Sequence, residues 1–179
     1  MKFPVRKRNR LRSYDYSRDG FYYFTSNAKN NICYFGEVRN QVMHLNEYGQ
    51  IVLEQWLWLE KQFPYVLCHE FVVMPNHVHG ILEIKRDCIR LKEGVLGSCS
   101  HEAIKIKPLS ELIGAFKMTA SKRIGLLVKA NISDTPGRPE FQWHRSYHDH
   151  IIRSHNAYLR IARYINRNPE NWRYDEFNR

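Results

Sequence analysis

The sequence predicts a single α+β domain built on an antiparallel sheet, with a further helix added near the C-terminal end. Short β-prone runs alternate with longer stretches in which apolar residues recur at helical spacing. The order of these patterns along the chain is β, α, β, β, α, β, α. With 179 residues, of which 43% are hydrophobic, the chain is long enough to bury one sizeable core.

The first elements predicted are a strand and a helix. Residues 21–25 (FYYFT) are aromatic and β-prone, and they follow the turn-forming pair Asp19 and Gly20. In residues 46–62 the apolar side chains recur at helical spacing, and Asn46 is a suitable N-cap. We therefore expect one helix to follow the first strand.

Three strand-like runs come next. Residues 65–68 and 71–74 are interpreted either as two short strands or as one strand that is split in the middle. Residues 77–84 (HVHGILEI) alternate at first and then become apolar, which is typical of a central strand.

Two predicted loops flank the second predicted helix in the sequence. Residues 86–107 show no clear period, and residues 131–140 are rich in proline and glycine, so both are expected to be loops. Between them, residues 109–126 carry apolar side chains on one stripe after Pro108, as in an amphipathic helix.

The last part of the chain predicts a strand over residues 147–153 and a helix over residues 155–168. Ser154 or Asn156 can cap this helix, and Pro169 disfavours helix at the residue before it. A β-α-β-β-α-β order is the ferredoxin-like pattern, so the last helix is an addition packed on that core.

The charge of the chain predicts a polyanionic partner. Lys and Arg together number 28 against 18 Asp and Glu, which gives a formal net charge of +10. Nucleic acid is preferred to a membrane surface, because no apolar run approaches the roughly 18 residues that span a bilayer. We expect residues 1–20 to form a basic arm and residues 21–179 to form one domain.

The compartment expected is the cytoplasm. No apolar segment follows the basic start of the chain, so the start does not resemble a secretory signal. The 4 cysteines include no CxxC pair, which favours reduced thiols over a disulfide framework or a zinc site.

A histidine pair is the first candidate site. His77 and His79 are separated by one residue at the start of a predicted strand, so their side chains point to the same face. Two neighbouring imidazoles can bind one divalent cation, and added oxygen ligands would suit Mg²⁺ or Mn²⁺. Taken alone, the pattern is equally compatible with two structural histidines.

The last helix carries the second candidate site. Tyr164 and Asn168 are four residues apart, which places them on one face of the helix. A phenol can attack phosphorus covalently, and an amide oxygen can complete a metal site. The alternative for Tyr164 is a tyrosine at the rim of the core, and for Asn168 an ordinary residue at the end of a helix.

These residues resemble the motifs of a known family. The stretch MPNHVHG at residues 74–80 looks like the HUH motif of single-tyrosine transposases. The stretch YINRNP at residues 164–169 looks like the tyrosine motif of the REP-associated tyrosine transposases, a subgroup of that family. Residues 45–49 and 150–153 are also similar to members of the subgroup, and the similarity covers residues 12–172.

The resemblance implies a ferredoxin-like endonuclease and strand-transfer enzyme that acts on single-stranded DNA folded as hairpins. It implies His77 and His79 as ligands of Mg²⁺ or Mn²⁺, Asn168 as a third ligand, and Tyr164 as the nucleophile. The product would be a 5′-phosphotyrosine with a free 3′-hydroxyl. Residues 143–150 depart from the commoner family form, so no role is carried onto His148.

A set of basic residues is expected to bind the DNA. Its members lie on the second predicted helix or near Tyr164: Lys117, Lys122, Arg153, Arg163 and Arg167. The alternative for any one of them is an ordinary solvated position.

Two other functions stay open on the sequence. One is a domesticated nucleic-acid-binding protein that no longer cleaves, and the other is a metallohydrolase that uses a metal-bound water. Monomer and homodimer also both remain open, because related transposases can place the tyrosine helix in the same chain or across a dimer.

Overall fold

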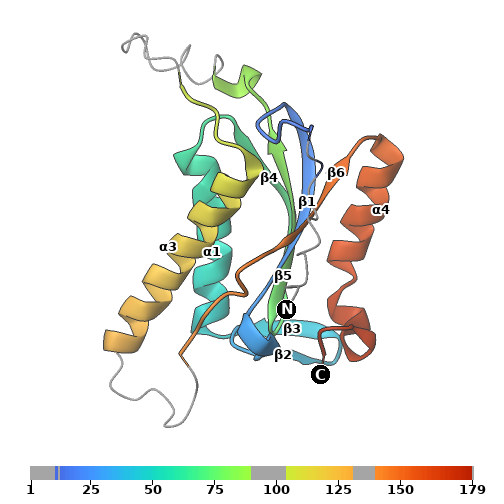
Figure 1. Ribbon diagram of the computed structural model, residues 1–179. Helices are drawn as coiled ribbons and strands as arrows, with labels where there is room; N and C mark the ends of the chain where they lie inside the picture. The colour runs from blue at the N-terminus through green and yellow to red at the C-terminus, as the bar shows by residue number, and fades with distance from the viewer. Residues whose placement is uncertain (1–10, 12, 90–103, 131–139, 179) are drawn as a thin grey trace, which may run out of the picture.

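The computed structural model describes residues 11, 13–89, 104–130 and 140–178, and its centre is one four-stranded antiparallel sheet (Figure 1). The strands lie in the order β4-β5-β1-β6. Their bounds are Gly20–Asn27 for β1, Val66–Val73 for β4, His77–Ile84 for β5 and His148–Ile152 for β6. This arrangement confirms the predicted α+β class with an antiparallel sheet and the ferredoxin-like order of its elements.

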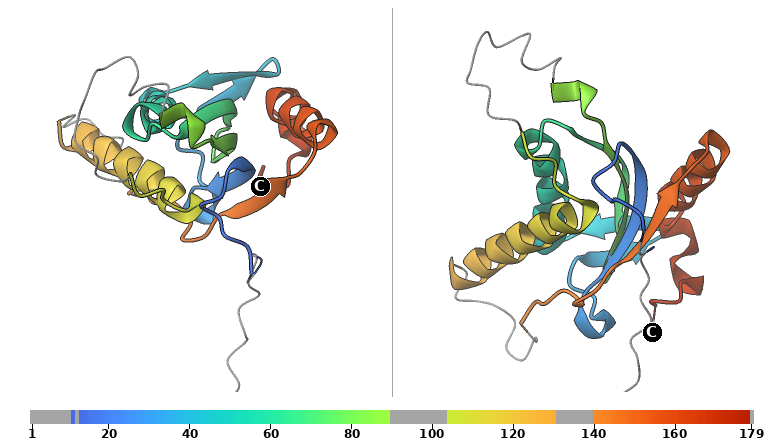
Figure 2. Two further views of the ribbon diagram at one scale, coloured as in Figure 1. Left: turned by 90° about the horizontal axis from the view of Figure 1, so that it is seen from above. Right: turned by 45° about the horizontal axis from the view of Figure 1, so that its top comes forward.

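Helices cover both faces of the sheet. The helices α1 (Glu47–Gln62) and α3 (Leu109–Ala130) pack on one face, and α4 (His155–Asn166) packs on the other (Figures 1 and 2). Asn46 caps α1 as predicted, because its side chain accepts a hydrogen bond from the backbone N–H of Gly49.

The start and the end of α4 follow from its flanking residues. Of the two predicted caps, Ser154 is the one used, and it accepts from the backbone N–H of Ala157. The helix ends two residues earlier than predicted. Pro169 has no N–H to donate to the carbonyl of Ile165, and the N–H of Asn168 bonds that carbonyl instead. A 3-10 helix, η2 (Pro169–Tyr174), then turns the chain back toward the sheet.

A hairpin between β1 and α1 was not predicted. It consists of β2 (Gly36–Arg39) and β3 (Val42–Leu45), which pair with each other outside the main sheet. The backbone at Asn40 and Gln41 has φ of 50° and 64°, which suits a tight hairpin turn. The short strands are largely exposed and carry little apolar alternation, so the usual sequence signal is weak.

The two runs expected at residues 65–68 and 71–74 form the single strand β4, interrupted by a bulge. Cys68 pairs with Leu82 and Phe71 pairs with Gly80, so β4 holds one more residue than its partner between these pairs.

The sheet separates a large core from a small one. The large core lies under α1 and α3 and includes Phe24, Trp56 and Phe116. The small core lies under α4 and has four buried members. They are Ile81, Ile152, Ala162 and Ile165. A small apolar core therefore joins α4, the helix that carries Tyr164, to the sheet.

Several predicted segments fall largely outside the described residues. They are the arm before residue 11 and most of the loops 86–107 and 131–140. Where the arm is described, Tyr14 and Tyr16 pack against the core beside Tyr22. The division into arm and domain stays a prediction. Among the described helices, none is long and apolar enough to cross a membrane.

Candidate functional site

The two histidines of the sequence motif lie side by side on β5. Val78 between them points into the large core, whereas His77 and His79 point to the face that α4 covers. Both imidazoles are buried, and their Nε2 atoms are 3.0 Å apart. The strand thus brings two ring nitrogens to one point.

Asn76 determines which nitrogen of His77 carries the proton. The Nδ2 atom of Asn76 donates to two backbone carbonyls, those of Asn31 at 2.9 Å and Phe177 at 2.7 Å. Because carbonyl oxygens only accept, the amide oxygen must face the Nδ1 atom of His77, which lies 2.8 Å away. His77 therefore carries its proton at Nδ1, and its Nε2 presents a lone pair.

His79 is held in a similar way by two residues of β1. Its Nδ1 lies 2.8 Å from the hydroxyl of Tyr23 and 2.8 Å from that of Thr25. Thr25 donates its own hydroxyl proton to Tyr23, so the Thr25 oxygen can accept from Nδ1–H of the imidazole. This network turns the Nε2 lone pair of His79 toward His77.

The electrostatics favour two neutral rings. Burial lowers the pKa of His77 to about 3 and lowers the pKa of His79 well below its ordinary value. Two lone pairs that face each other across 3.0 Å repel unless a cation lies near both. Neutral imidazoles, each with its Nδ1 held by a neighbour, are the usual form of metal-binding histidines.

A carboxylate that the sequence did not predict completes this cluster. Asp175 follows η2, and its Oδ2 lies 3.8 Å from Nε2 of His77. One ligand atom from each of His77, His79 and Asp175 lies within 4.8 Å of the other two. Burial raises the pKa of Asp175, as expected for a carboxyl group turned inward.

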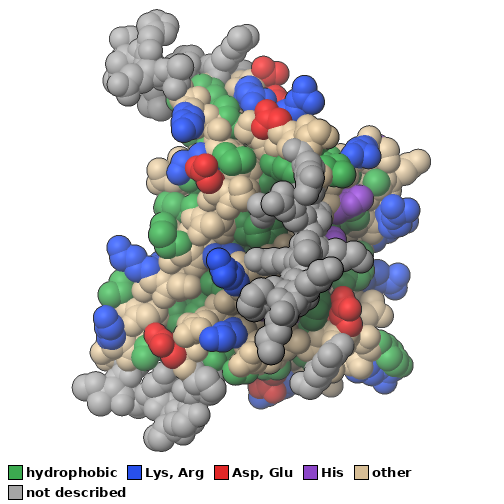
Figure 3. Space-filling view, viewed as in Figure 1, with side chains coloured by type: hydrophobic (Ala, Val, Ile, Leu, Met, Phe, Trp, Pro, Cys, Tyr) green, Lys and Arg blue, Asp and Glu red, His purple; other side chains and the backbone are tan. Residues whose placement is uncertain are grey.

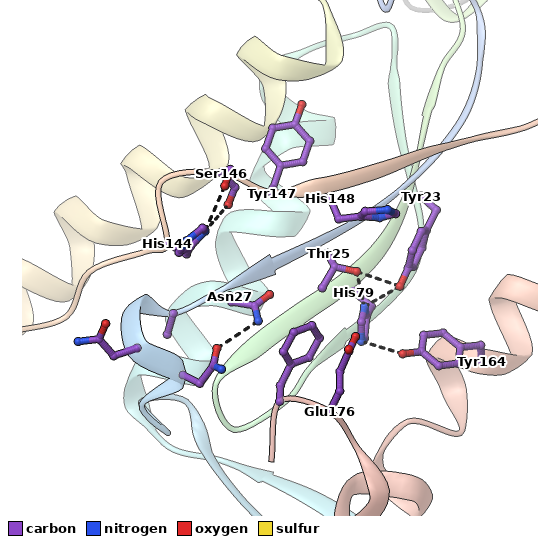
Figure 4. A pocket seen from close by; sticks show the side chains of 14 residues that line it. Tyr23, Thr25, Asn27, His79, His144, Ser146, Tyr147, His148, Tyr164 and Glu176 are labelled. Atoms are coloured by element: carbon purple, nitrogen blue, oxygen red, sulfur yellow. Dashed lines mark hydrogen bonds between the residues drawn. The ribbon is translucent and has the colours of Figure 1, made fainter. Parts of the chain in front are cut away.

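Tyr164 also reaches the histidines. Its hydroxyl lies 3.4 Å from Nε2 of His79, and its ring makes edge contacts with the rings of His79 and Tyr23 (Figure 4). The side chain is 49% exposed, so it is open to a ligand. Burial on its inner side raises the pKa of Tyr164, and hydrogen bonding with Asn168 partly offsets that rise.

Asn168 lies buried at the turn after α4. Only 3% of its surface is exposed, and its Oδ1 has no hydrogen-bond partner within the described part of the chain. A buried amide oxygen without a partner is costly, unless a ligand satisfies it. The side chain of Asn168 therefore offers an oxygen left free by the described residues, as the expected role of metal ligand requires.

An open cleft of about 650 Å³ adjoins the tyrosine and the histidines. His79 and Tyr164 lie at one side, and His148 points across from β6 (Figure 4). Asn27 and the C-terminal Glu176 are also among the lining residues. The cleft is large enough to hold part of a ligand beside the hydroxyl of Tyr164.

The expected basic residues divide between the two faces of the sheet. Arg163 and Arg167 are exposed on and just after α4, and Arg153 is exposed just before it. Several Lys and Arg side chains lie over α4, at the right edge of Figure 3. Lys122 is exposed on α3, which packs on the opposite face, so the structure does not bring it to the histidines.

Lys117 has contacts within the protein. Its ammonium group donates to the backbone carbonyl of His144 at 2.7 Å and lies over the ring of Trp143. Partial burial lowers the pKa of Lys117 to about 8. Because His144 lines the cleft, Lys117 lies near the candidate site.

Comparison with known proteins shows a similarity in sequence and a similarity in fold. No protein-family model matches the chain. The chain is 36% identical over 179 residues to an uncharacterized protein of Haemophilus influenzae, covering 96% of this chain and 92% of that protein. A solved structure of a REP-associated tyrosine transposase bound to a REP hairpin is similar, with a TM-score of 0.56 and 16% identity. That similarity covers 93% of this chain and 76% of the transposase chain.

Proposed function

Because the chain belongs to the same family as the Haemophilus influenzae protein and has the fold of a REP-associated tyrosine transposase, we propose that it is a metal-dependent transposase of single-stranded DNA. Fold alone implies no activity, so the proposal depends on the site. The observation that carries it is the hydroxyl of Tyr164, 3.4 Å from Nε2 of His79 beside a second inward-facing imidazole.

The donor set suits a divalent cation. His77 and His79 would supply two imidazole nitrogens, while Asp175 and Asn168 offer oxygen ligands. When bound there, Mg²⁺ or Mn²⁺ would polarise a phosphate oxygen of the DNA and orient it. Asn76, Tyr23 and Thr25 hold the rings with their Nε2 lone pairs turned inward.

Tyr164 is the proposed nucleophile. Its oxygen forms a bond to phosphorus as the bond from phosphorus to the 3′ oxygen of the neighbouring nucleotide breaks. The phenol loses its proton and the departing 3′ oxygen gains one, which leaves a 5′-phosphotyrosine and a free 3′-hydroxyl. Because the link conserves the energy of the broken bond, the same strand can be joined to another 3′-hydroxyl.

The substrate proposed is a single strand folded as a hairpin, from repetitive DNA. The transposase with the same fold was solved with a REP hairpin bound. The basic residues near the cleft and on the tyrosine helix would neutralise phosphates of that strand. They are Lys117, Arg153, Arg163 and Arg167, with Lys122 more distant on α3.

The site needs no second subunit in this arrangement. Tyr164 and His79 come from one chain and already lie within 3.4 Å. This supports cleavage in cis, by a monomer or by each subunit of a homodimer.

The proposal is tested by formation of a protein–DNA adduct that survives SDS. With hairpins taken from DNA flanking the gene and Mn²⁺, the wild type is expected to form the adduct. Tyr164→Phe is expected to bind the hairpin but to form no adduct. Tyr174→Phe is the matched control, because Tyr174 is 74% exposed in the same C-terminal region and does not line the cleft.

The same assay separates the other two functions. Tight, salt-sensitive hairpin binding without cleavage by the wild type would indicate a domesticated binding protein. Cleavage that survives in Tyr164→Phe but is lost in His77→Ala would indicate a metallohydrolase that uses a metal-bound water.

A further inference from the structure

A polar cluster lies on the α4 face of the sheet and contacts α4 at Tyr158, about 1.7 turns before Tyr164. The hydroxyl of Tyr158 donates to Glu70 Oε2 at 2.7 Å and lies 3.2 Å from Nδ1 of His69. The other nitrogen of His69, Nε2, pairs with Glu83 Oε2 at 2.8 Å. We call His69, Glu70, Glu83 and Tyr158 the helix clamp.

The bulge in β4 makes the clamp possible. In a regular strand, the neighbours His69 and Glu70 would point to opposite faces of the sheet. The extra residue between Cys68 and Phe71 lets both of them reach the same phenol on the α4 face. After the bulge, Phe71 returns to the large core and stacks on Trp56 with ring centroids 4.6 Å apart.

Few side chains of α4 are fully buried against the sheet. Of its 12 residues, Ala162 and Ile165 are the buried ones. Ala157, Tyr158 and Ile161 are partly buried against the same small core. Apolar contacts are not directional, whereas a hydrogen bond depends on the angle between its groups and so restricts the rotation of a helix. Tyr158 supplies such bonds near the start of the helix, and Tyr164 follows it by about 9 Å at 1.5 Å per residue.

We propose that the helix clamp positions the nucleophile: His69, Glu70 and Glu83 act through Tyr158 to set where α4 holds the hydroxyl of Tyr164. Within the described residues, no clamp member lines the cleft or belongs to the His77–His79–Asp175 cluster. The clamp residues are therefore positioning residues. This inference rests on the proposed function of Tyr164.

Two substitutions isolate the clamp from general stability. Tyr158→Phe removes the hydroxyl and keeps the ring against Phe21, whose centroid is 5.4 Å away. Glu70→Ala removes the acceptor, whereas Glu70→Gln keeps a side-chain oxygen that can accept from Tyr158. Glu54→Ala is the control, since Glu54 pairs with Arg123 on the opposite face of the sheet.

The experiment measures the single-turnover rate of adduct formation at saturating hairpin, the Kd for the hairpin, and hydrogen exchange of the α4 amides. In Tyr158→Phe and Glu70→Ala the rate is expected to fall about tenfold or more, because small displacements of a reacting group are costly. The Kd is expected to stay within about twofold, as for a loss confined to the chemical step. Exchange in α4 is expected to quicken, and Glu70→Gln and Glu54→Ala are expected to match the wild type.

Two results would overturn the proposal that the helix clamp positions Tyr164. One is a wild-type rate and wild-type α4 exchange in Tyr158→Phe. The other is a parallel loss of rate, hairpin affinity and exchange protection over the whole sheet, which would show a general stabilising role. If the wild type itself forms no adduct, the proposed function fails, and the exchange of α4 alone then decides the clamp.

Discussion

The Nε2 atoms of His77 and His79 lie 3.0 Å apart because the other nitrogen of each ring is held by a neighbour. Asn76 holds His77, and its amide cannot flip, since its nitrogen already donates to two backbone carbonyls. The sequence motif therefore supplies more than the two proposed ligands: Asn76, the residue before the first histidine, orients its ring.

Asn76→Ala should weaken metal binding although Asn76 is not itself a ligand. Loss of such an outer partner typically lowers metal affinity by about 10- to 100-fold. Titration calorimetry with Mn²⁺ measures this, with Asn156→Ala, an exposed amide on α4, as the control. Equal affinity in wild type and Asn76→Ala would show that the orientation of His77 does not depend on this bond.

The third ligand can be assigned by two matched substitutions. Asp175→Asn removes a charge from the His77–His79–Asp175 cluster, and Asn168→Ala removes the buried oxygen that has no partner in the described structure. We expect Asp175→Asn to reduce Mn²⁺ affinity by about tenfold, the scale of one good interaction with a charged group. Unchanged affinity in Asp175→Asn together with loss in Asn168→Ala would assign the ligand to Asn168 alone.

Gly80→Ala should destabilise the sheet directly behind the motif. A Cβ at Gly80 would lie 2.8 Å from ring atoms of both Phe24 and Phe71, which are packed in the large core. Overpacking of this kind costs about 1–3 kcal/mol. The free energy of unfolding in urea measures the effect.

Gly114→Ala is the matched control for this substitution. Nothing lies within 4 Å of a Cβ at Gly114 in α3, so alanine should stabilise by about 0.5–1 kcal/mol through helix propensity. A neutral Gly80→Ala beside a stabilising Gly114→Ala would contradict the packing described for β5.

Lys117 should make the protein more stable as the pH rises above 8. Its pKa in the folded protein is about 8, against an ordinary value of 10.5. Between these values the unfolded chain binds more protons than the folded one, so the free energy of unfolding increases with pH. Lys117→Met should remove this increase, and the difference between the two pH profiles isolates it from tyrosines that titrate nearby. If the unfolding free energies of the wild type and Lys117→Met change in parallel from pH 8 to 10, the lowered pKa of Lys117 is refuted.

Local patterns were sufficient to predict the sheet and part of the site. The alternation at residues 77–84 predicted β5 and the shared face of His77 and His79, because side chains repeat every two residues in a strand. The spacing of Tyr164 and Asn168 predicted that they would lie near each other, although Asn168 is in the turn after the helix.

The remaining features depend on contacts between distant segments. Asp175 reaches His77 only because η2 reverses the chain, and no local pattern marks it as a ligand. The bulge in β4 appeared in the sequence only as a gap between two runs. Its role depends on Tyr158, nearly ninety residues further along the chain.

The central claim is that Tyr164 becomes covalently attached to the 5′-phosphate of the downstream fragment, the one that keeps the 3′ end of the cleaved strand. A hairpin substrate labelled at its 3′ end, incubated with the wild type and Mn²⁺, should yield a labelled adduct, and mass spectrometry of its peptides should place the nucleotide on Tyr164. Omission of the metal should abolish the adduct. An adduct on another residue, or one that carries only the 5′ portion of the strand, would contradict the account.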